Sequence, residues 1–403
     1  MESKKSVGVS GLGLALLLGA QGAMAQVAVQ PQAIPFGSFV LVPALVTQTV
    51  YDDNVYNTHT DEVSSFYQTL NPSFAFIAQD RLNVYSATYA INAASYANDS
   101  DDSYADQLFD LKAHIESNAR LRFDLGANYA MTHDARGVGF TSGSSLTELY
   151  AYGEVDKFDL ATLSAGVEYG AKDARGLLRA DVSTSQKRYD RELVAKARDN
   201  DSMSASVGLR ARLMPKTQFL IDIEHATTEY ESSSGSPDST DNRIFAGIEW
   251  KGTAQTTGKL RLGQSKREVD GLDDKSKFSW DVDVIWQPRQ FDSINLNSGN
   301  RLSDATLPYV SLENTHYGVS WKHDWAERLN TVVSLGFSTD DYEAPAGVKN
   351  RTDDSSQYGV SVNYQMRRWL IWNASIQATD RSSDVQIYDT KRNVMSVGAQ
   401  ISL

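Results

Sequence analysis

Charged and amide side chains recur at alternate positions of otherwise apolar segments, and they are the residues of this chain that can do chemistry. Residues two apart on a β-strand point to the same face of that strand. We therefore expect them to form one polar wall that faces water and carries charges of both signs. The candidate wall residues are Arg179, Asp181, Arg210, Arg212, Asp222, Glu224, Glu249, Lys259, Arg261, Asp281, Asp283, Asn363 and Gln365.

A wall of mixed charge suits the hydroxyl groups of hydrated sugars. It would hold neither cations nor anions strongly, because opposite charges partly cancel and salt screens the remainder over about 8 to 10 Å. The alternative interpretation is structural: each charged residue is then a solvated wall position or one partner of a salt bridge within the wall.

Signals of catalysis and of cofactor binding are absent from the sequence. The six histidines are scattered without metal-ligand spacing, and there is no G-x-S-x-G, no H-E-x-x-H and no phosphate loop. Asp222, Glu224 and His225 are close in sequence, but alternation sends His225 to the opposite face from both carboxylates. We therefore predict no catalytic site, no cofactor and no metal site.

The segment from Tyr51 to Tyr56 places Asp52, Asp53 and Asn54 side by side, which invites a calcium interpretation. A calcium loop needs alternating ligands and more of them than three adjacent oxygen side chains. We therefore favour an exposed loop with flanking tyrosines at the membrane interface.

The elements that position these residues show a hydrophobic period of two. From Phe278 to Trp286 every even position is apolar, and the odd positions include Ser279, Asp281 and Asp283. Such alternation recurs to the end of the chain and predicts strands with one apolar and one polar face.

The N-terminus predicts export from the cytoplasm. Lys4 and Lys5 precede an apolar run over 7–19, and Ala23-Met24-Ala25 offers a cleavage site. No later segment reaches the roughly 18 uninterrupted apolar residues of a spanning helix, so membrane insertion must use strands. We predict a signal peptide over 1–25, a periplasmic N-terminal leader over 26–37 and an outer-membrane β-barrel over 38–403, with the wall residues lining its pore.

Composition agrees with this location. The chain has no cysteine, which excludes thiol catalysis and suits passage through an oxidising periplasm. Its formal net charge is −13, and the mature chain, with 36 basic and 50 acidic residues after loss of Glu2, Lys4 and Lys5, carries −14. Acidic balance argues against nucleic acid as a partner.

The predicted architecture is a transmembrane antiparallel up-and-down barrel of about 18 strands, with 16 to 20 as the range. Residues 137–158 are the least regular part: 146–156 reads equally as a further strand, a helical loop element or a segment folded over the pore. The expected strands are 38–50, 63–79, 81–97, 105–117, 119–133, 159–171, 176–189, 200–213, 217–230, 240–251, 256–267, 276–287, 291–302, 311–323, 328–340, 353–367, 370–382 and 392–403.

Long acidic connections alternate with short turns between these segments, as is typical of outer-membrane barrels. The long ones predict exterior loops, and their acidic clusters could hold divalent cations that bridge lipopolysaccharide, although a solvated loop is the simpler interpretation. Six of the seven tryptophans lie beside the short turns and predict an aromatic girdle at the periplasmic interface with outer-membrane lipid. They are Trp250, Trp286, Trp321, Trp325, Trp369 and Trp372.

The last predicted strand ends the chain, with Met395, Val397, Ala399 and Ile401 on its apolar face. A terminal strand of this kind predicts recognition by the barrel-assembly machinery. Outer-membrane barrels usually finish in Phe or Trp, and Leu403 departs from that pattern.

Several short motifs resemble the putative β-barrel porin 2 family of exopolysaccharide and capsule gene clusters. The resemblance covers nearly the whole mature chain and rests on Pro43 followed by 51–56, Trp286-Gln287-Pro288, the segment 321–325, and Arg367-Arg368-Trp369. It implies an outer-membrane channel that exports a polysaccharide to the cell surface, together with a periplasmic polysaccharide export protein and a copolymerase.

Two other functions remain open at this point. The same barrel can serve as a passive diffusion porin for small hydrophilic solutes without any partner. It can also be a structural or adhesive surface protein whose acidic loops bind matrix or lipopolysaccharide.

Overall fold

The computed structural model describes residues 34–402 apart from 233, 234, 254 and 346. The signal peptide expected over 1–25 lies outside the described residues, as does the expected leader up to residue 33. The last residues of that leader form a short strand, β1 (Ile34–Phe36), which pairs with the start of β2 through a turn at Gly37. Gly37 has a φ of +63°, a conformation that glycine adopts without steric cost.

Eighteen strands close an antiparallel barrel within the described part of the chain. Each strand pairs with the next in sequence, and β19 pairs with β2, so the barrel formed by these strands has no free edge. The barrel strands are β2 (Phe39–Asp52), β3 (Ser65–Asp80), β4 (Asn83–Tyr96), β5 (Tyr104–Asn118), β6 (Leu121–Asp134), β7 (Asp156–Tyr169), β8 (Gly176–Tyr189), β9 (Asn200–Met214), β10 (Thr217–Tyr230), β11 (Ser239–Thr253), β12 (Thr256–Val269), β13 (Lys275–Arg289), β14 (Asp292–Ser303), β15 (Ser311–Ala326), β16 (Leu329–Glu343), β17 (Arg351–Arg367), β18 (Leu370–Ser383) and β19 (Thr390–Ser402).

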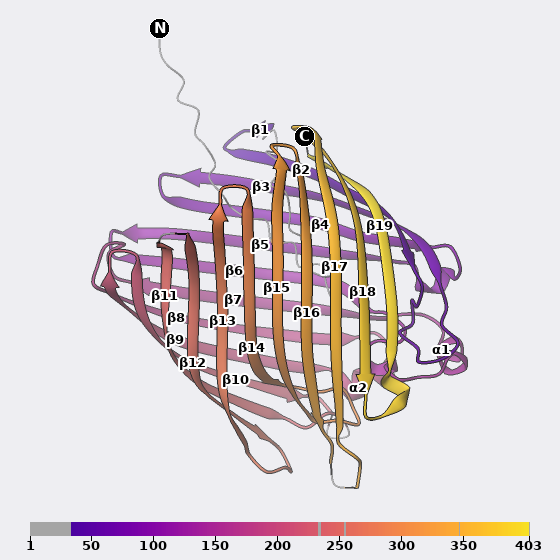
Figure 1. Cartoon of the computed structure of the whole chain (residues 1–403). Coiled ribbons are helices and arrows are strands. Elements are labelled where there is room, and N and C mark those ends of the chain that lie inside the picture. Colours follow the sequence, from indigo (N-terminus) through magenta and orange to yellow (C-terminus); the bar gives the residue numbers. More distant parts are fainter. Residues whose placement is uncertain (1–33, 233–234, 254, 346, 403) are drawn as a thin grey trace.

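This architecture confirms the predicted fold class and strand count. Every expected strand is present, and its ends lie within three residues of the expected ones. Strands on opposite walls are tilted in opposite directions, so β15 to β18 cross in front of β5 to β7 (Figure 1). No helix among the described residues is long and apolar enough to cross a membrane.

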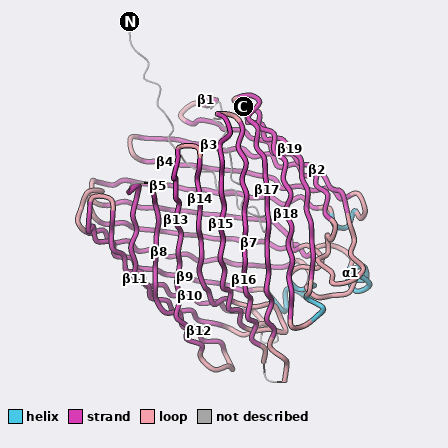
Figure 2. The backbone as a smooth tube through the Cα atoms, viewed as in Figure 1, coloured by secondary structure: helices cyan, strands magenta, loops and turns pink. Residues whose placement is uncertain are grey.

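The two ends of the barrel differ in their connections. At one end most turns contain two residues, such as Arg81 and Leu82 between β3 and β4. At the other end lie the longer loops, with α1 (Leu146–Tyr152), α2 (Glu192–Arg198) and three 3₁₀ turns, at Ser100–Asp102, Gly139–Thr141 and Gln386–Tyr388. Both helices lie among the loops of that end (Figure 2).

Residues 137–155 form a loop that contains the helix α1 and no further strand, and 156–158 are the start of β7. Ser145 caps α1 by accepting a hydrogen bond from the backbone N–H of Glu148, and the Glu148 side chain accepts one from the backbone N–H of Ser145. This capping box satisfies donors at the start of the helix and explains why the segment becomes helical.

The two faces of the barrel wall differ in polarity. Side chains such as Leu209, Ile223, Ile244 and Leu262 are exposed on the outer face. The register places polar residues on the inner face of the same strands, as with Asp222 opposite Gly208. Since an exposed apolar band needs hydrocarbon around it, the outer face is suited to lipid and the inner face to water.

Candidate functional site

The predicted wall residues share the inner face of the barrel. In antiparallel pairs, residues directly opposite each other lie on the same face. The register joins Arg261 with Asp281 and Lys259 with both Glu249 and Asp283, and Asp222 and Arg179 each lie opposite Gly208. Eleven of the thirteen therefore lie together on β8 to β13, whereas Asn363 and Gln365 lie on β17. That these residues touch a passing solute stays a prediction.

Arg261 is the centre of one cluster on this charged wall. Its Nη1 lies 3.0 Å from Glu224 Oε1 and 3.3 Å from Asp222 Oδ2, and its guanidinium also pairs with Asp281. Arg210 Nη1 lies 2.5 Å from the other oxygen of Asp222. Each cation in this cluster thus meets carboxylates of neighbouring strands, so neither sign of charge dominates here.

A glycine leaves room for this arrangement. A Cβ atom built on Gly208 would lie 2.7 Å from Asp222 Oδ1 and 3.0 Å from Arg210 Nη1. The first contact is shorter than real Cβ atoms show and the second is tighter than most, so the ion pair occupies space that a side chain at this position would need.

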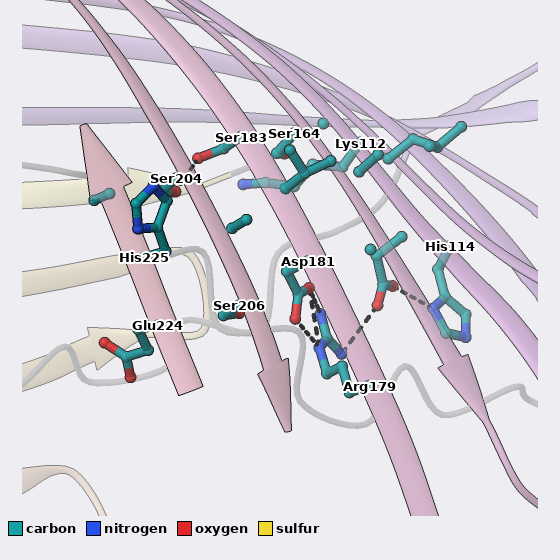
Figure 3. Close-up of a pocket in the computed structure, with 18 of the residues that line it drawn as sticks. Lys112, His114, Ser164, Arg179, Asp181, Ser183, Ser204, Ser206, Glu224 and His225 are labelled. Carbon is teal, nitrogen blue, oxygen red and sulfur yellow. Dashed lines mark hydrogen bonds and ion pairs between the residues drawn. The ribbon is translucent and has the colours of Figure 1, made fainter. Parts of the chain in front are cut away.

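A second cluster continues the charged wall towards β5. Arg179 pairs with Asp181 at 2.7 Å and reaches Asp124 at 3.2 Å, and Asp124 in turn lies 2.7 Å from His114 Nδ1. Figure 3 shows Arg179 and Asp181 beside each other, with dashed contacts that continue to His114. His114 and Asp124 were not among the predicted wall residues, although both occupy inner positions of alternating segments.

The inner wall bounds a cavity of about 890 Å³. Its lining comes from β4 to β11 together with Arg301 of β14, and Figure 3 labels several of these residues. Arg243 also lines it and lies 3.7 Å from Glu224, and it was not among the predicted wall residues. Within the described residues, no group of three or more His, Asp or Glu is arranged to hold a metal ion.

The remaining predicted wall residues have more local partners. Arg212 donates to the backbone oxygens of Lys172 and Asp173, so its side chain binds the β7–β8 turn. Glu249 accepts a hydrogen bond from Gln218 at 2.7 Å. On the opposite side of the barrel, the side-chain amide of Asn363 forms hydrogen bonds with the side-chain amides of Asn330 and Asn373.

The predicted girdle tryptophans lie at the end with the short turns. Trp250, Trp286, Trp321 and Trp372 occupy outer positions near the ends of their strands, and Trp325 is 61% exposed. Trp369 lies in the β17–β18 turn. This placement is compatible with an interfacial girdle, and contact with lipid stays a prediction.

The expectation of an exposed loop at 51–56 was wrong. Asp52 and Asn54 are fully buried and Tyr56 is 2% exposed. Asp52 forms a multiple ion pair with Arg392 of β19, and Asn54 donates to the backbone oxygens of Thr58 and Lys391. Closure of the barrel brings these partners together, so the acidic segment joins the first barrel strand to the last.

Arg136 ties three outer loops together. Its guanidinium lies 2.7 Å from Asp102 and 2.6 Å from Asp99, and the Tyr56 hydroxyl donates to Asp102 at 2.8 Å. The hydrogen bond from Arg136 holds the pKa of Asp99 below its usual value. Burial raises the pKa of Tyr56, so its hydroxyl stays protonated and donates.

Three tyrosines surround Arg351 at the same end of the barrel. The guanidinium carbon lies 3.6 Å from the ring centre of Tyr388, 3.7 Å from that of Tyr342 and 4.6 Å from that of Tyr309. Asp353, which is fully buried, lies 3.1 Å from the Arg351 Nε. We call these residues the tyrosine cage; it joins the β14–β15 loop, β16, β17 and the β18–β19 loop.

The β6–β7 loop also contacts the tyrosine cage, through Gly143 and Tyr388. Gly143, at a φ of +78°, lies so close to Tyr388 that a Cβ atom would come within 2.6 Å of the ring. In barrel order, β2 to β5 lie between the strands that these two loops join, which are β18 and β19 for one loop and β6 and β7 for the other. The β6–β7 loop therefore extends over neighbouring strand ends at the barrel mouth.

Comparison with known proteins identifies one family. The model of the family described as putative beta-barrel porin 2 matches residues 27–403. No curated protein matches the chain.

Solved structures share the fold at very low identity. The chain is similar to OpdO of Pseudomonas aeruginosa, with 11% identity, a TM-score of 0.51 and coverage of 90% of this chain and 97% of that one. A BenF-like porin from Pseudomonas fluorescens Pf-5 gives 9% identity, a TM-score of 0.51 and coverage of 90% and 99%. A mutant of the ferric enterobactin receptor PfeA from Pseudomonas aeruginosa gives 8% identity, a TM-score of 0.50 and coverage of 90% of this chain and 80% of that one. These likenesses concern the fold.

Proposed function

Since the chain belongs to the putative beta-barrel porin 2 family and forms a β-barrel of the bacterial outer membrane, we propose that it exports a polysaccharide to the cell surface. Family and fold indicate a channel rather than an enzyme. The polymer would be an exopolysaccharide or a capsular polysaccharide that crosses the membrane through the barrel lumen.

The ion-paired inner wall is the observation that carries this proposal. A barrel of 18 strands is too wide for its own side chains to fill and can hold water. Arg261 and Arg210 neutralise the carboxylates around them, so the wall offers polar contacts without a strong field of one sign. Such a wall lets a hydrated, hydroxyl-rich chain move without trapping it.

The proposed partners follow from the resemblance of the sequence motifs to the family. A polymer made in the cytoplasmic membrane must cross the periplasm, so the barrel would act with a periplasmic polysaccharide export protein and a copolymerase. We further propose that the barrel-assembly machinery inserts the chain and that lipopolysaccharide surrounds its outer loops.

Deletion of the gene in its native host tests the proposal. We expect surface and secreted polysaccharide to fall and complementation with the intact chain to restore them. Unchanged polymer with altered uptake of small hydrophilic solutes would overturn export and support a diffusion porin. Unchanged polymer and uptake with lost surface adhesion would support an adhesive barrel.

A further inference from the structure

One side of the barrel lumen carries no charge over most of its height. It consists of seven strands that are consecutive in barrel order, β16 to β19 followed by β2 to β4. We define the neutral arc as the inner positions of residues 330–338, 355–365, 371–379, 394–400, 44–50, 67–77 and 86–96. These positions carry mostly Asn, Gln, Ser, Thr, Gly and Ala with a few larger apolar residues, and no Asp, Glu, Lys, Arg or His.

Amide and hydroxyl groups of the neutral arc bind one another across strands. Asn373 Nδ2 donates to Asn363 Oδ1 at 2.8 Å, and Asn363 Nδ2 donates to Asn330 Oδ1 at 3.0 Å. The hydroxyls of Ser375 and Ser396 lie 2.8 Å apart. Neutral polar groups therefore bond across β16 to β18 through the three asparagines, and across β18 and β19 through the two serines.

The neutral arc also keeps hydrogen-bonding capacity that the protein does not use. Thr69 Oγ1, Asn71 Oδ1 and Asn373 Oδ1 are buried and have no hydrogen-bond partner among the described residues. Buried polar atoms of this kind are normally satisfied by protein, water or ligand. Amide and hydroxyl groups can both donate and accept, which is the pattern that sugar hydroxyls need.

The charged wall on β8 to β13 lies across the lumen from the neutral arc and differs from it in chemistry. Its cations Arg210 and Arg261 pair with carboxylates, as Arg261 does with Glu224 and Asp281. An acidic polymer finds no cation at the inner positions of the neutral arc, so its carboxylates would lose water there without gaining an opposite charge. An uncharged polymer needs no such partner.

From this division of the lumen, and resting on the proposed export function, we propose that the neutral arc is the contact surface for an uncharged, hydroxyl-rich glycan. The barrel then prefers neutral glycans to glycans that carry carboxylates.

The test compares two oligosaccharides of equal length on the purified full-length barrel in planar bilayers. One is an uncharged gluco-oligosaccharide and the other an oligogalacturonate, and the block of ionic current is measured for each. We expect the neutral compound to block at about ten-fold lower concentration. For a barrel that carries no current, calorimetric binding of the same two compounds in detergent replaces the current measurement.

Variants then locate the contact. Gln357→Ala and Asn373→Ala should weaken block or binding by the neutral compound several-fold, because the Gln357 side chain is an exposed inner position of β17. Asn242→Ala, an asparagine on the outer face of β11, is the matched control and should leave it unchanged. Equal or stronger interaction of the acidic compound, or neutral-compound affinity unchanged in both arc variants, would overturn the proposal.

The outcome is separable from that of the export proposal. If gene deletion leaves surface polymer unchanged while the neutral compound still binds the arc, export fails and the glycan preference stands. If deletion removes surface polymer but the acidic compound binds better, export stands and the neutral preference fails.

Discussion

Arg351→Met should loosen the β18–β19 loop at the barrel mouth. The Arg351 side chain is 6% exposed and Asp353 is fully buried, so the substitution leaves a buried carboxylate without its cation. Removing one partner of a buried ion pair costs about 3 to 5 kcal/mol. Asp353 still accepts a hydrogen bond from Ser383 at 2.6 Å, which places the expected cost near the lower limit, about 3 kcal/mol.

Hydrogen exchange of residues 384–389 measures this opening directly. The backbone N–H groups of Tyr388 and Asp389 donate within the 3₁₀ turn, so their exchange reports whether the loop stays closed. A cost of about 3 kcal/mol corresponds to about 100-fold faster exchange, since about 1.4 kcal/mol is ten-fold.

Two further variants separate the causes. Arg351→Met combined with Asp353→Asn removes both charges, and mainly the contacts with the tyrosine rings are then lost. These are worth about 1 kcal/mol, so exchange should rise only about five-fold. Lys349→Met removes an exposed cation that pairs with Asp384 of the same loop at 3.0 Å, and should change exchange by less than about five-fold.

The reasoning fails if the double variant exchanges as fast as Arg351→Met alone. In that case the buried carboxylate is not the source of the cost. If exchange in Arg351→Met rises by less than about five-fold, the cost of about 3 kcal/mol for the unpaired carboxylate is refuted.

Three more predictions concern the outer loops, the lumen and the membrane interface. The lowered pKa of Asp99 stabilises the folded loops above the ordinary carboxyl value, and this contribution is lost as the pH falls through the folded value. Limited proteolysis of residues 135–155 should therefore accelerate in acid. Arg261→Gln removes a positive charge from the lumen wall and should raise the cation-to-anion permeability ratio about two-fold, since a charge about 8 Å from an ion in water contributes about 0.5 kcal/mol. The reversal potential in a salt gradient measures this ratio. Tryptophan emission should be quenched most by lipids brominated near the headgroup, since six of the seven tryptophans lie near the short turns.

Each of these predictions has a control and a contradicting outcome. Asp99→Asn should flatten the acid dependence of proteolysis, and proteolysis that ignores pH in the unsubstituted chain would contradict the first. Arg261→Lys should keep the original reversal potential, and no shift in Arg261→Gln would contradict the second. Strongest quenching by lipids brominated near the chain ends would contradict the third.

The strands and their polar faces were predictable because alternation is a local property. A period of two places residues such as Arg179 and Asp181 on one face before any pairing is known. The ends of the strands were predictable for a similar reason, since polar and acidic residues interrupt the alternation there. The helix at Leu146–Tyr152 was only one of three interpretations of its segment, although Ser145 and Glu148 form the S-x-x-E pattern of a capping box.

The partners of the charged residues were not predictable from alternation. His114 and Asp124 face each other only because β5 and β6 pair in one register, and a shift by one residue would send Asp124 to the lipid side. The neutral arc depends on strand pairing too. It forms only because β19 pairs with β2, which brings strands from the two ends of the chain side by side.

The sequence by itself determined an exported, strand-built barrel with alternating polar and apolar positions. Only the tertiary structure decided what buries Asp52 and what surrounds Arg351. Asp52 and Arg392 are 340 residues apart in sequence, and the tyrosine cage draws on Tyr309, Tyr342 and Tyr388 from separate segments. Such contacts arise from ring closure and loop packing, which depend on the whole chain, whereas the alternation depends on each strand alone.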